Sequence, residues 1–243
     1  MKWLLILGAS SDVARAVAHT YARTGWNIYL AGRDVGSLAV DASDIEIRYR
    51  VKSSAIHFDA LQPKRHDSFY KSLVPKPEGV LCAVGLQGDQ LRAQQDFRET
   101  ASIVGTNYLG CVSILDLVAA DFEKKKSGFI IGISSVAGDR GRASNYAYGS
   151  AKAGFTTYLS GLRNRLNKSN VHVLTVKPGF VFTKMTEGKN LPALLTAEPA
   201  QVAADIFEAQ HRGADVLYTR WFWRWIMLFI RLIPERVFKR LSL

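Results

Sequence analysis

Short apolar runs rich in aliphatic and β-branched residues recur along the chain. They span residues 3–7, 27–30, 55–58, 79–84, 128–134, 171–176 and 216–218. Most are almost continuously apolar, which is typical of parallel strands covered on both faces of a sheet. The pattern therefore predicts seven buried strands.

Helical periodicity fills several of the segments between these runs. The apolar residues of 13–21 share one face of a helix that we expect to end near Gly25, and residues 96–126, 146–168 and 198–212 show a similar pattern. Strands that alternate with helices in this way form parallel, doubly wound sheets. The sequence therefore predicts an α/β fold.

The domain organisation follows from the length and from the segments that break the pattern. A chain of 243 residues favours one large domain, and residues 1–219 contain no linker or repeat. Residues 184–197, with Gly188 and Pro192, lack a strong period and are predicted to form a mobile insertion that acts as a lid. Residues 220–243 differ in composition and are treated as an appendage.

Composition excludes several classes of protein. Hydrophobic residues make up 48% and charged residues 22%, so the chain is neither disordered nor dense in disulfides. Cys82 and Cys111 lie in apolar surroundings without CxxC spacing, and we expect reduced, buried thiols in a cytoplasmic protein. The apolar start is shorter than a signal peptide requires, and no run reaches the roughly 18 to 20 apolar residues of a membrane span.

The net charge of +11 raises the question of an anionic partner. Outside the appendage the basic residues are dispersed, and the run Lys124-Lys125-Lys126 closes a predicted helix, where cations complement the helix dipole. Without a basic and aromatic stripe or a known DNA-binding motif, we expect no nucleic-acid partner. The five histidines show no metal-ligand spacing, so no metal site is predicted.

The turn between the first strand and the first helix is the first candidate binding site. Gly8-Ala9-Ser10-Ser11-Asp12-Val13-Ala14 stands where backbone N–H groups and the helix dipole hold a pyrophosphate in dinucleotide-binding folds. Of the three glycines usual in such a loop, only Gly8 is kept. Asp12 would repel a diphosphate but is a good N-cap, so an ordinary turn capped by Asp12 is the alternative.

The end of the second strand carries Gly32-Arg33-Asp34. A carboxylate here selects NAD by binding the ribose 2′-hydroxyl, whereas an arginine pairs with the 2′-phosphate of NADP. Arg33 therefore favours NADP. Asp34 leaves NAD open as the alternative.

Tyr148 and Lys152 stand four residues apart in a predicted helix and therefore share one face. A tyrosine becomes a usable proton donor and acceptor when a nearby ammonium stabilises its phenolate. Ser135 ends the fifth apolar run, at the strand edge where open α/β sheets bind ligands. Asn107 is a polar residue inside an otherwise apolar helix, and a satisfied buried amide is the alternative explanation for it.

In combination, these residues resemble the short-chain dehydrogenases/reductases over about residues 2–219. In chain order the resemblance rests on Gly8, Asp59, Asn107, Ser135, Tyr148, Lys152 and the run 178–183, Pro-Gly-Phe-Val-Phe-Thr. It implies a Rossmann-type sheet with strand order 3-2-1-4-5-6-7. It also implies an NAD(P)-dependent oxidoreductase that interconverts a carbonyl and a secondary alcohol.

The resemblance implies a role for each member of a catalytic tetrad. Ser135 would hold the substrate carbonyl, and Tyr148 would exchange a proton with its oxygen. Lys152 would stabilise the Tyr148 phenolate and bind the nicotinamide ribose, while Asn107 would hold a water in the proton relay. The implied cofactor contacts are Gly8, Ser10, Ser11, Asp12, Val13, Arg33, Asp59 at the adenine, Ala83, Val84, Gly85, Tyr148, Lys152, Pro178, Gly179, and Val181 and Thr183 at the carboxamide.

Two features depart from the family pattern. Asp12 replaces a loop glycine, and Cys82-Ala83-Val84-Gly85 stands where the family has Asn-Asn-Ala-Gly, so side-chain hydrogen bonds that brace the sheet are absent. The loop, the missing asparagines and the appendage are similar to a subgroup of keto-reductases. Members of that subgroup act with a flavin oxidase in the epimerisation of polyprenyl-phosphate-linked ribose. That similarity implies a lipid-linked keto-sugar as the substrate.

The appendage, residues 220–243, combines aromatic and aliphatic residues with six Lys/Arg against one Glu. On a helix, Arg220, Arg224 and Arg231 fall within about 40° of one another and apolar residues occupy the remainder. The pattern predicts an amphipathic helix at a membrane interface, with arginines that reach anionic lipid. Packing on the domain or on an oligomer partner are the alternatives.

Taken together, the sequence predicts an NADP-dependent oxidoreductase domain over residues 1–219 and a basic, Trp-rich amphipathic tail over 220–243. We expect a cytoplasmic protein, peripheral on the inner face of the cytoplasmic membrane, that is a homodimer or homotetramer as is usual in the family. A non-catalytic NADP-binding sensor or membrane-associated scaffold is the alternative.

Overall fold

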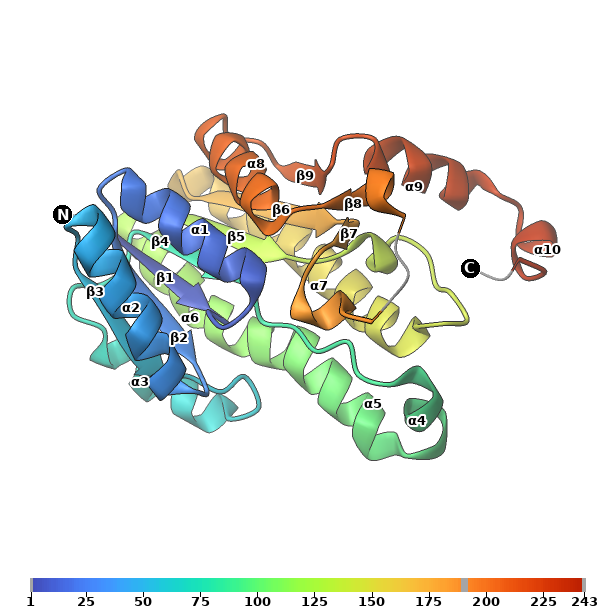
Figure 1. The fold of residues 1–243 in the computed structure, drawn as a ribbon, viewed down its shortest axis with the longest axis horizontal. Coiled ribbons are helices and arrows are strands. Elements are labelled where there is room, and N and C mark those ends of the chain that lie inside the picture. Colours follow the sequence, from blue (N-terminus) through green and yellow to red (C-terminus); the bar gives the residue numbers. More distant parts are fainter. Residues whose placement is uncertain (1, 189–191, 242–243) are drawn as a thin grey trace.

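A seven-stranded parallel sheet forms the centre of the computed structural model, which describes residues 2–188 and 192–241 (Figure 1). From one edge to the other the strands are β3 (Ser53–His57), β2 (Asn27–Gly32), β1 (Trp3–Leu7), β4 (Gly79–Cys82), β5 (Phe129–Ile133), β6 (His172–Pro178) and β9 (Val216–Thr219). All neighbouring pairs are parallel. The predicted fold and strand order are therefore confirmed.

Helices cover both faces of this sheet. One layer consists of α1 (Asp12–Arg23), α2 (Val35–Tyr49) and α8 (Pro199–His211), and the other of α3 (His66–Ser72), α6 (Gly110–Lys125) and α7 (Tyr146–Leu166). Successive strand residues face opposite layers, so Leu4 and Ile6 pack in one core and Leu5 and Leu7 in the other. Short helical turns η1 (Pro63–Arg65) and η4 (Asn167–Ser169) lie beside the second of these layers.

The predicted helix over 96–126 is divided into three pieces. After α4 (Gln90–Gln95), the chain forms α5 (Phe97–Val104), a π-helical turn η2 (Gly105–Leu109) and then α6. By length and composition this helix, Phe97–Lys125, is apolar enough to cross a membrane. In α6, however, Ile114, Leu115, Val118 and Phe122 are buried against the sheet, as in a core helix.

The predicted lid segment contains regular structure at its end. Residues 184–197 hold two short turns, η5 (Lys184–Thr186) and η6 (Ala193–Leu195), and then β8 (Thr196–Ala197), which pairs with β7 (Phe180–Val181). Thr196 and Ala197 are buried. The segment is therefore anchored at residue 196, contrary to the prediction of an irregular insertion through residue 197, and its residues 189–191 lie outside the described part.

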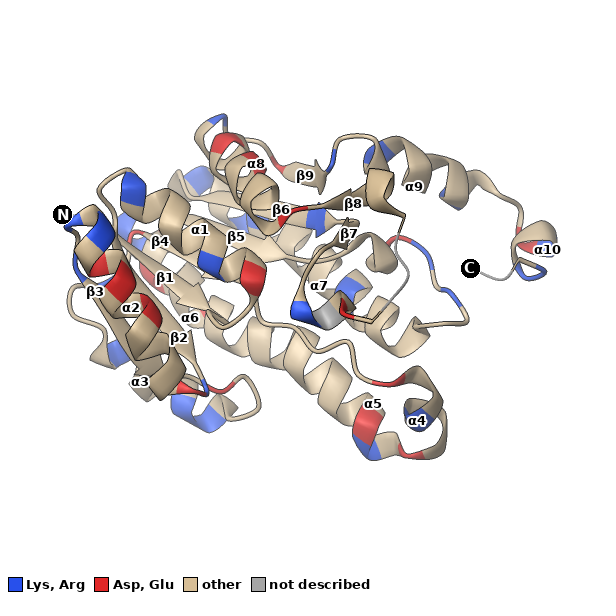
Figure 2. Cartoon of the chain, viewed as in Figure 1, with Lys and Arg blue, Asp and Glu red and all other residues tan. Residues whose placement is uncertain are grey.

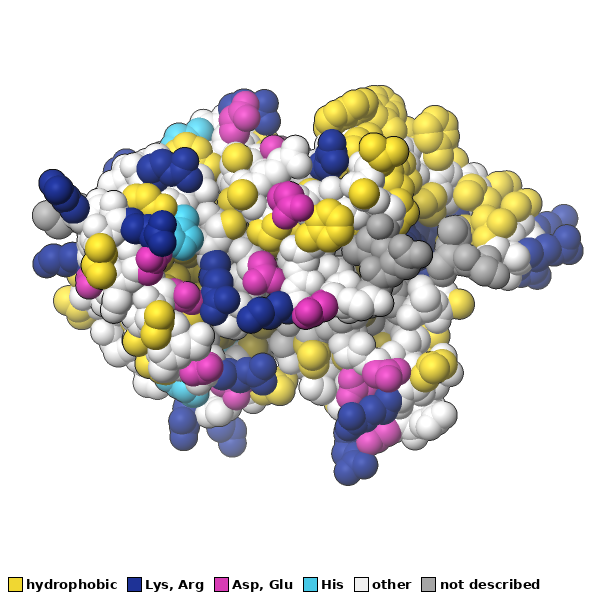
Figure 3. Space-filling model, in the orientation of Figure 1, with side chains coloured by type: hydrophobic (Ala, Val, Ile, Leu, Met, Phe, Trp, Pro, Cys, Tyr) yellow, Lys and Arg dark blue, Asp and Glu magenta, His cyan; other side chains and the backbone are white. Residues whose placement is uncertain are grey.

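The C-terminal appendage forms α9 (Trp223–Leu232) and α10 (Glu235–Phe238), after β9. Arg220 lies before α9, so the predicted helix begins three residues later than its first arginine. Trp223, Met227 and Phe238 are buried. One face of α9 thus packs on the domain, which was one of the alternatives, while its other face is exposed and forms the hydrophobic patch over α9 in Figure 3.

The charged residues are distributed over both helical layers and the tail (Figure 2). Lys124 and Lys125 lie in the last turn of α6, and Lys126 caps that helix in the left-handed conformation. Their position at a helix C-terminus agrees with the helix-dipole explanation of this basic run.

Candidate active site

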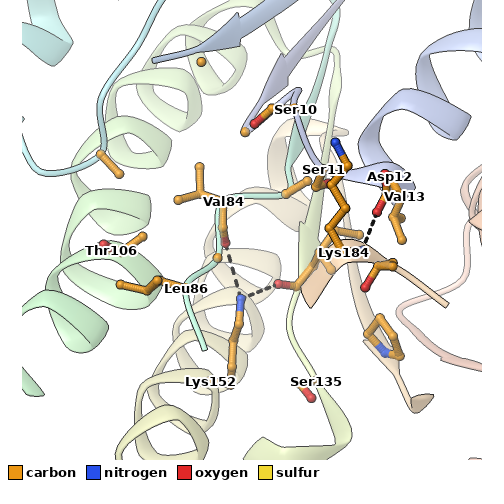
Figure 4. Close-up of a pocket in the computed structure, with 18 of the residues that line it drawn as sticks. Ser10, Ser11, Asp12, Val13, Val84, Leu86, Thr106, Ser135, Lys152 and Lys184 are labelled. Atoms are coloured by element: carbon orange, nitrogen blue, oxygen red, sulfur yellow. Dashed lines mark hydrogen bonds between the residues drawn. The ribbon is translucent and has the colours of Figure 1, made fainter. Parts of the chain in front are cut away.

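A cavity of about 410 Å³ opens at the carboxyl ends of β1, β4, β5 and β6. This is the edge at which open α/β sheets bind ligands. All predicted site residues except Asn107 line it: Gly8, Ser10, Ser11, Asp12, Val13, Arg33, Asp59, Ala83, Val84, Gly85, Ser135, Tyr148, Lys152, Pro178, Gly179, Val181 and Thr183. Figure 4 shows that side chains from distant parts of the chain meet around this space.

The glycine loop requires Gly8 for a steric reason. Gly8 has φ of 77°, and a Cβ atom at this position would lie 2.8 Å from the backbone nitrogen of Val84. Any other residue would force β1 and the loop after β4 apart. The cap of α1 is Ser11, whose Oγ accepts a hydrogen bond of 3.1 Å from the Ala14 N–H, so the alternative of an ordinary turn capped by Asp12 is wrong.

The Asp12 carboxylate has a different partner. Its Oδ2 accepts a hydrogen bond of 2.9 Å from the backbone N–H of Lys184, which ties the glycine loop to the segment after β7 (Figure 4). Lys184 itself lines the cavity and was not among the predicted site residues, although it directly follows Thr183. The cation of Lys184 and the carboxylate of Asp12 therefore stand on the same side of the cavity.

Arg33 and Asp34, at the end of β2, make different contacts. The Asp34 side chain accepts a hydrogen bond of 3.1 Å from the Ser37 N–H and caps α2, whereas Arg33 is exposed and lines the cavity. Burial alone would raise the pKa of the nearby Asp59 carboxyl. Hydrogen bonds from Leu61 and Gln62, together with the charge of Arg33, outweigh burial and hold that pKa below its usual range.

Tyr148 and Lys152 lie on one face of α7, as predicted. Lys152 is buried, and its Nζ donates hydrogen bonds to the carbonyl oxygens of Ile133 at 2.9 Å and Val84 at 3.4 Å (Figure 4). The same Nζ lies 5.8 Å from the centre of the Tyr148 ring. The ammonium is thus fixed between the ends of β4 and β5, close to the phenol.

The two serines after β5 point to opposite sides. Ser134 is buried, and its Oγ donates to the carbonyl oxygen of Lys152 at 3.0 Å. Ser135 lines the cavity, and its Oγ accepts a 3.1 Å hydrogen bond from the Ala137 N–H at the start of η3 (Val136–Gly138). Since that bond uses the oxygen as acceptor, the Ser135 O–H can donate to a ligand.

Asn107 is fully buried in the π-helical turn and does not line the cavity. Its Nδ2 donates to the carbonyl oxygens of Leu86 at 2.6 Å and Ile103 at 2.8 Å, and its Oδ1 accepts from the Leu86 N–H at 3.2 Å. Leu86 does line the cavity. Asn107 therefore fixes the loop after β4, and any contact of its side chain with a relayed water stays a prediction.

The lining of the cavity suits an anionic ligand. The cavity extends from the N-terminus of α1, where backbone N–H groups attract anions, past Arg33 and Lys184 to Tyr148. The close approach of Gly8 to Val84 leaves the backbone at the cavity wall without an intervening side chain. These features suit a dinucleotide, whereas no group of three or more metal-binding side chains occurs within residues 2–188 and 192–241.

Comparisons with known proteins agree with this geometry. Residues 2–193 match the short chain dehydrogenase family. An uncharacterized oxidoreductase of Mycobacterium tuberculosis is 36% identical over 241 residues, which cover 98% of this chain and 96% of the relative. Another, from Streptomyces coelicolor, is 32% identical over 244 residues, with 98% and 95% covered.

Solved structures share the fold. A short-chain dehydrogenase from Sphingobium yanoikuyae in complex with NADPH superposes with a TM-score of 0.85 at 22% identity, over 94% of this chain and 92% of that one. The family match covers most of the chain, and the relative at 36% identity covers nearly all of it. This chain therefore belongs to the short-chain dehydrogenase family and is an NAD(P)-dependent oxidoreductase.

Proposed function

We propose that this protein interconverts a ketone and a secondary alcohol with NADP as cofactor and Tyr148 as the acid and base. The observation that carries the proposal is the meeting of Ser135, Tyr148 and Lys152 at one cavity that also contains the glycine loop. A proton donor, a hydrogen-bond donor and a fixed ammonium at one cavity are the groups that carbonyl reduction needs.

In the reductive direction the substrate carbon gains a hydride and its oxygen gains a proton. NADPH, when bound, supplies the hydride. The Ser135 O–H donates a hydrogen bond to the carbonyl oxygen, and the Tyr148 O–H transfers its proton to that oxygen as negative charge develops there. The Lys152 ammonium stabilises the resulting phenolate, which regains a proton from solvent through water near the loop that Asn107 fixes.

The choice of NADP over NAD rests on the end of β2. The Asp34 carboxylate is engaged as the cap of α2, while the Arg33 guanidinium lies at the cavity. An arginine pairs with a phosphate through charge-assisted hydrogen bonds. The NADPH bound by the similar dehydrogenase of Sphingobium yanoikuyae supports the same choice.

We further propose that the substrate is a lipid-linked keto-sugar, as the resemblance to the keto-reductase subgroup implies. Three polar atoms that precede Tyr148 in the sequence are buried and have no hydrogen-bond partner among the described residues. They are Gln90 Nε2, Arg142 Nε and Asn145 Oδ1. Gln90 and Asn145 lie at the start of α7, because Gln90 Oε1 accepts from the Ala147 N–H and Asn145 is the N-cap residue, whereas the Arg142 side chain reaches α9, where its Nη2 donates to Met227 Sδ at 3.5 Å. Buried donors and acceptors of this kind call for a hydroxyl-bearing ligand or ordered water.

The exposed face of α9 supports attachment to a membrane surface. Trp225, Phe229 and Leu232 are 51%, 68% and 69% exposed, and Trp221 just before the helix is 74% exposed. The tail that carries them has six basic residues against one glutamate. Aromatic and aliphatic side chains with arginines beside them fit an anionic bilayer better than a neutral partner.

Membrane attachment has a direct test. The double variant with Trp225→Ser and Phe229→Ser should bind vesicles that contain phosphatidylglycerol much more weakly than the unaltered protein does. Vesicles of phosphatidylcholine alone should bind both proteins weakly. Equal binding of the two proteins to the anionic vesicles would refute the attachment, and concentration-dependent association without vesicles would assign this face to the proposed homodimer or homotetramer instead.

The reaction itself is tested with purified protein, NADPH and a panel of ketones that includes keto-sugars, by following the loss of NADPH absorbance. Tyr148→Phe should abolish turnover and keep NADPH affinity within about twofold, because the phenyl ring retains the shape of the side chain. If the unaltered protein binds NADPH but reduces no ketone and oxidises no alcohol, the non-catalytic sensor or scaffold is the correct description.

A further inference from the structure

The C-terminal helix α9 touches the loops that form the active site. The Trp223 indole lies directly against Gly179, since a Cβ on that glycine would come within 2.0 Å of the Trp223 Nε1. The same ring packs edge-on against Phe180, with ring centres 5.1 Å apart, and its Nε1 donates to the Leu195 carbonyl at 3.2 Å. Trp223 thus contacts both Gly179, which lines the cavity, and the segment that follows it.

The loop that carries Ser135 is tied to the same helix. Val136, the next residue, packs in one cluster with Trp223 and Met227. Arg140 donates hydrogen bonds to the carbonyl oxygens of Ile230 at 2.6 Å and Ile233 at 2.7 Å, where α9 ends. An arginine at this place satisfies the carbonyls that a helix C-terminus leaves without partners.

Further contacts hold Arg140 in this position. Its Nη2 pairs with Glu235 Oε2 at 2.8 Å, and its guanidinium stacks over the Phe238 ring at 3.7 Å from the centre. The Arg140 side chain is only 14% exposed. A mostly buried guanidinium with this many partners fixes the backbone on which it stands, five residues after Ser135.

We propose that the C-terminal segment is part of the active-site framework, with Trp223 and Arg140 as positioning residues. Trp223 holds the backbone at Gly179, and Arg140 holds the loop that carries Ser135. The two contacts keep the Gly179 backbone and the Ser135 hydroxyl at fixed distances from Tyr148. The inference rests on the proposed reaction. It means that α9 supports catalysis on a soluble substrate through its inner face, independently of any lipid contact on its outer face.

The test measures NADPH-dependent reduction of a small soluble ketone without vesicles. Trp223→Ala should lower kcat by about tenfold or more, with less change in KM, because small displacements of catalytic groups affect the transition state more than ground-state binding. Trp223→Phe keeps a flat ring against Gly179 and should restore most of kcat. Leu228→Ser, on the outer side of the same helix, should leave kcat unchanged.

A second variant distinguishes a positioning role of Trp223 from a general loss of protein stability. Leu166→Ala removes a fully buried side chain at the far end of α7, about 20 Å along the helix from Lys152. It should lower the melting temperature at least as much as Trp223→Ala but keep kcat. If both variants lose kcat in proportion to stability, or if Trp223→Phe rescues nothing, the positioning role is refuted.

Hydrogen exchange keeps the inference testable if the protein reduces no ketone. Trp223→Ala should then speed exchange of the backbone amides in residues 135–142 and 178–182, and Leu166→Ala should not. The lack of ketone reduction would refute the proposed reaction, and the faster exchange in Trp223→Ala alone would support the positioning role. Unchanged exchange in Trp223→Ala would refute the positioning role whatever the activity.

Discussion

Replacement of Gly149 tests how the Ser135 loop is held beside Tyr148. A Cβ on Gly149, next to Tyr148 on α7, would lie 2.8 Å from the carbonyl oxygen of Ala137. On the opposite side of this contact, a Cβ on Gly138 would lie 2.8 Å from the Ala153 backbone nitrogen. The two glycines therefore allow η3 to rest directly on the first turns of α7.

The magnitude for Gly149→Ala follows from two opposed effects. Alanine favours a helix interior over glycine by about 1 kcal/mol. Its methyl group would, however, have to move the Ala137 carbonyl away by about 0.6 Å to reach ordinary contact, and such overpacking costs about 1 to 3 kcal/mol. Ala137 is two residues from Ser135, so we expect kcat to fall about ten- to a hundredfold, with a net loss of stability of about 0 to 2 kcal/mol.

Gly161→Ala is the matched control, because Gly161 lies in the same helix and a Cβ on it would have nothing within 4 Å. It should raise the melting temperature by about 2 to 4 °C and leave kcat unchanged. Both variants are compared by calorimetry and by steady-state reduction of one ketone with NADPH. A Gly149→Ala protein that gains stability and keeps full kcat would refute the argument that close packing of η3 on α7 positions Ser135.

Three further predictions concern single side chains. Arg33→Gln should weaken NADPH binding about 10- to 150-fold, the equivalent of about 1.5 to 3 kcal/mol, and leave NADH binding nearly unchanged in a fluorescence titration. Lys177→Met leaves the buried Asp139 carboxylate without its 2.5 Å ion-pair partner, and calorimetry should show a loss of about 3 to 5 kcal/mol. Asn107→Leu should release the loop at Leu86 and lower kcat more than it raises the KM for the ketone, as measured by steady-state kinetics.

The sheet could be predicted from the sequence because its strands are buried on both faces. Residues 3–7 are apolar and fully enclosed, and the other runs differ from the observed strands by only a few residues at their ends. The helix α2 was not predicted. Only Leu38, Ala42 and Ile45 of its fifteen residues are buried, which leaves a weak apolar stripe on an exposed helix.

The meeting of Ser135, Tyr148 and Lys152 at one cavity was predictable for a similar reason, since a fixed spacing on one helix face and one strand end brings them together. The contacts of Asp12 and Arg140 were not. Asp12 bonds to Lys184, 172 residues away, and Arg140 caps α9 through Ile230 and Ile233, which are 90 and 93 residues away, so no local pattern reveals these contacts. The inner face of α9 was hidden likewise, because the tail is apolar on nearly all sides and its periodicity cannot tell which side packs on the domain.

The departures from the family pattern can be reconciled with a working dinucleotide site. The Asp12 carboxylate, which would repel a diphosphate if it turned into the cavity, is held by the Lys184 N–H, and the Lys184 side chain adds a cation to the same wall. At the missing asparagines, Cys82 is fully buried in the core and Asn107 braces the following loop through both backbone groups of Leu86. Asn107 of the π-helical turn thus braces the loop after β4 although the two asparagines are missing, and Gly8 still approaches Val84 closely.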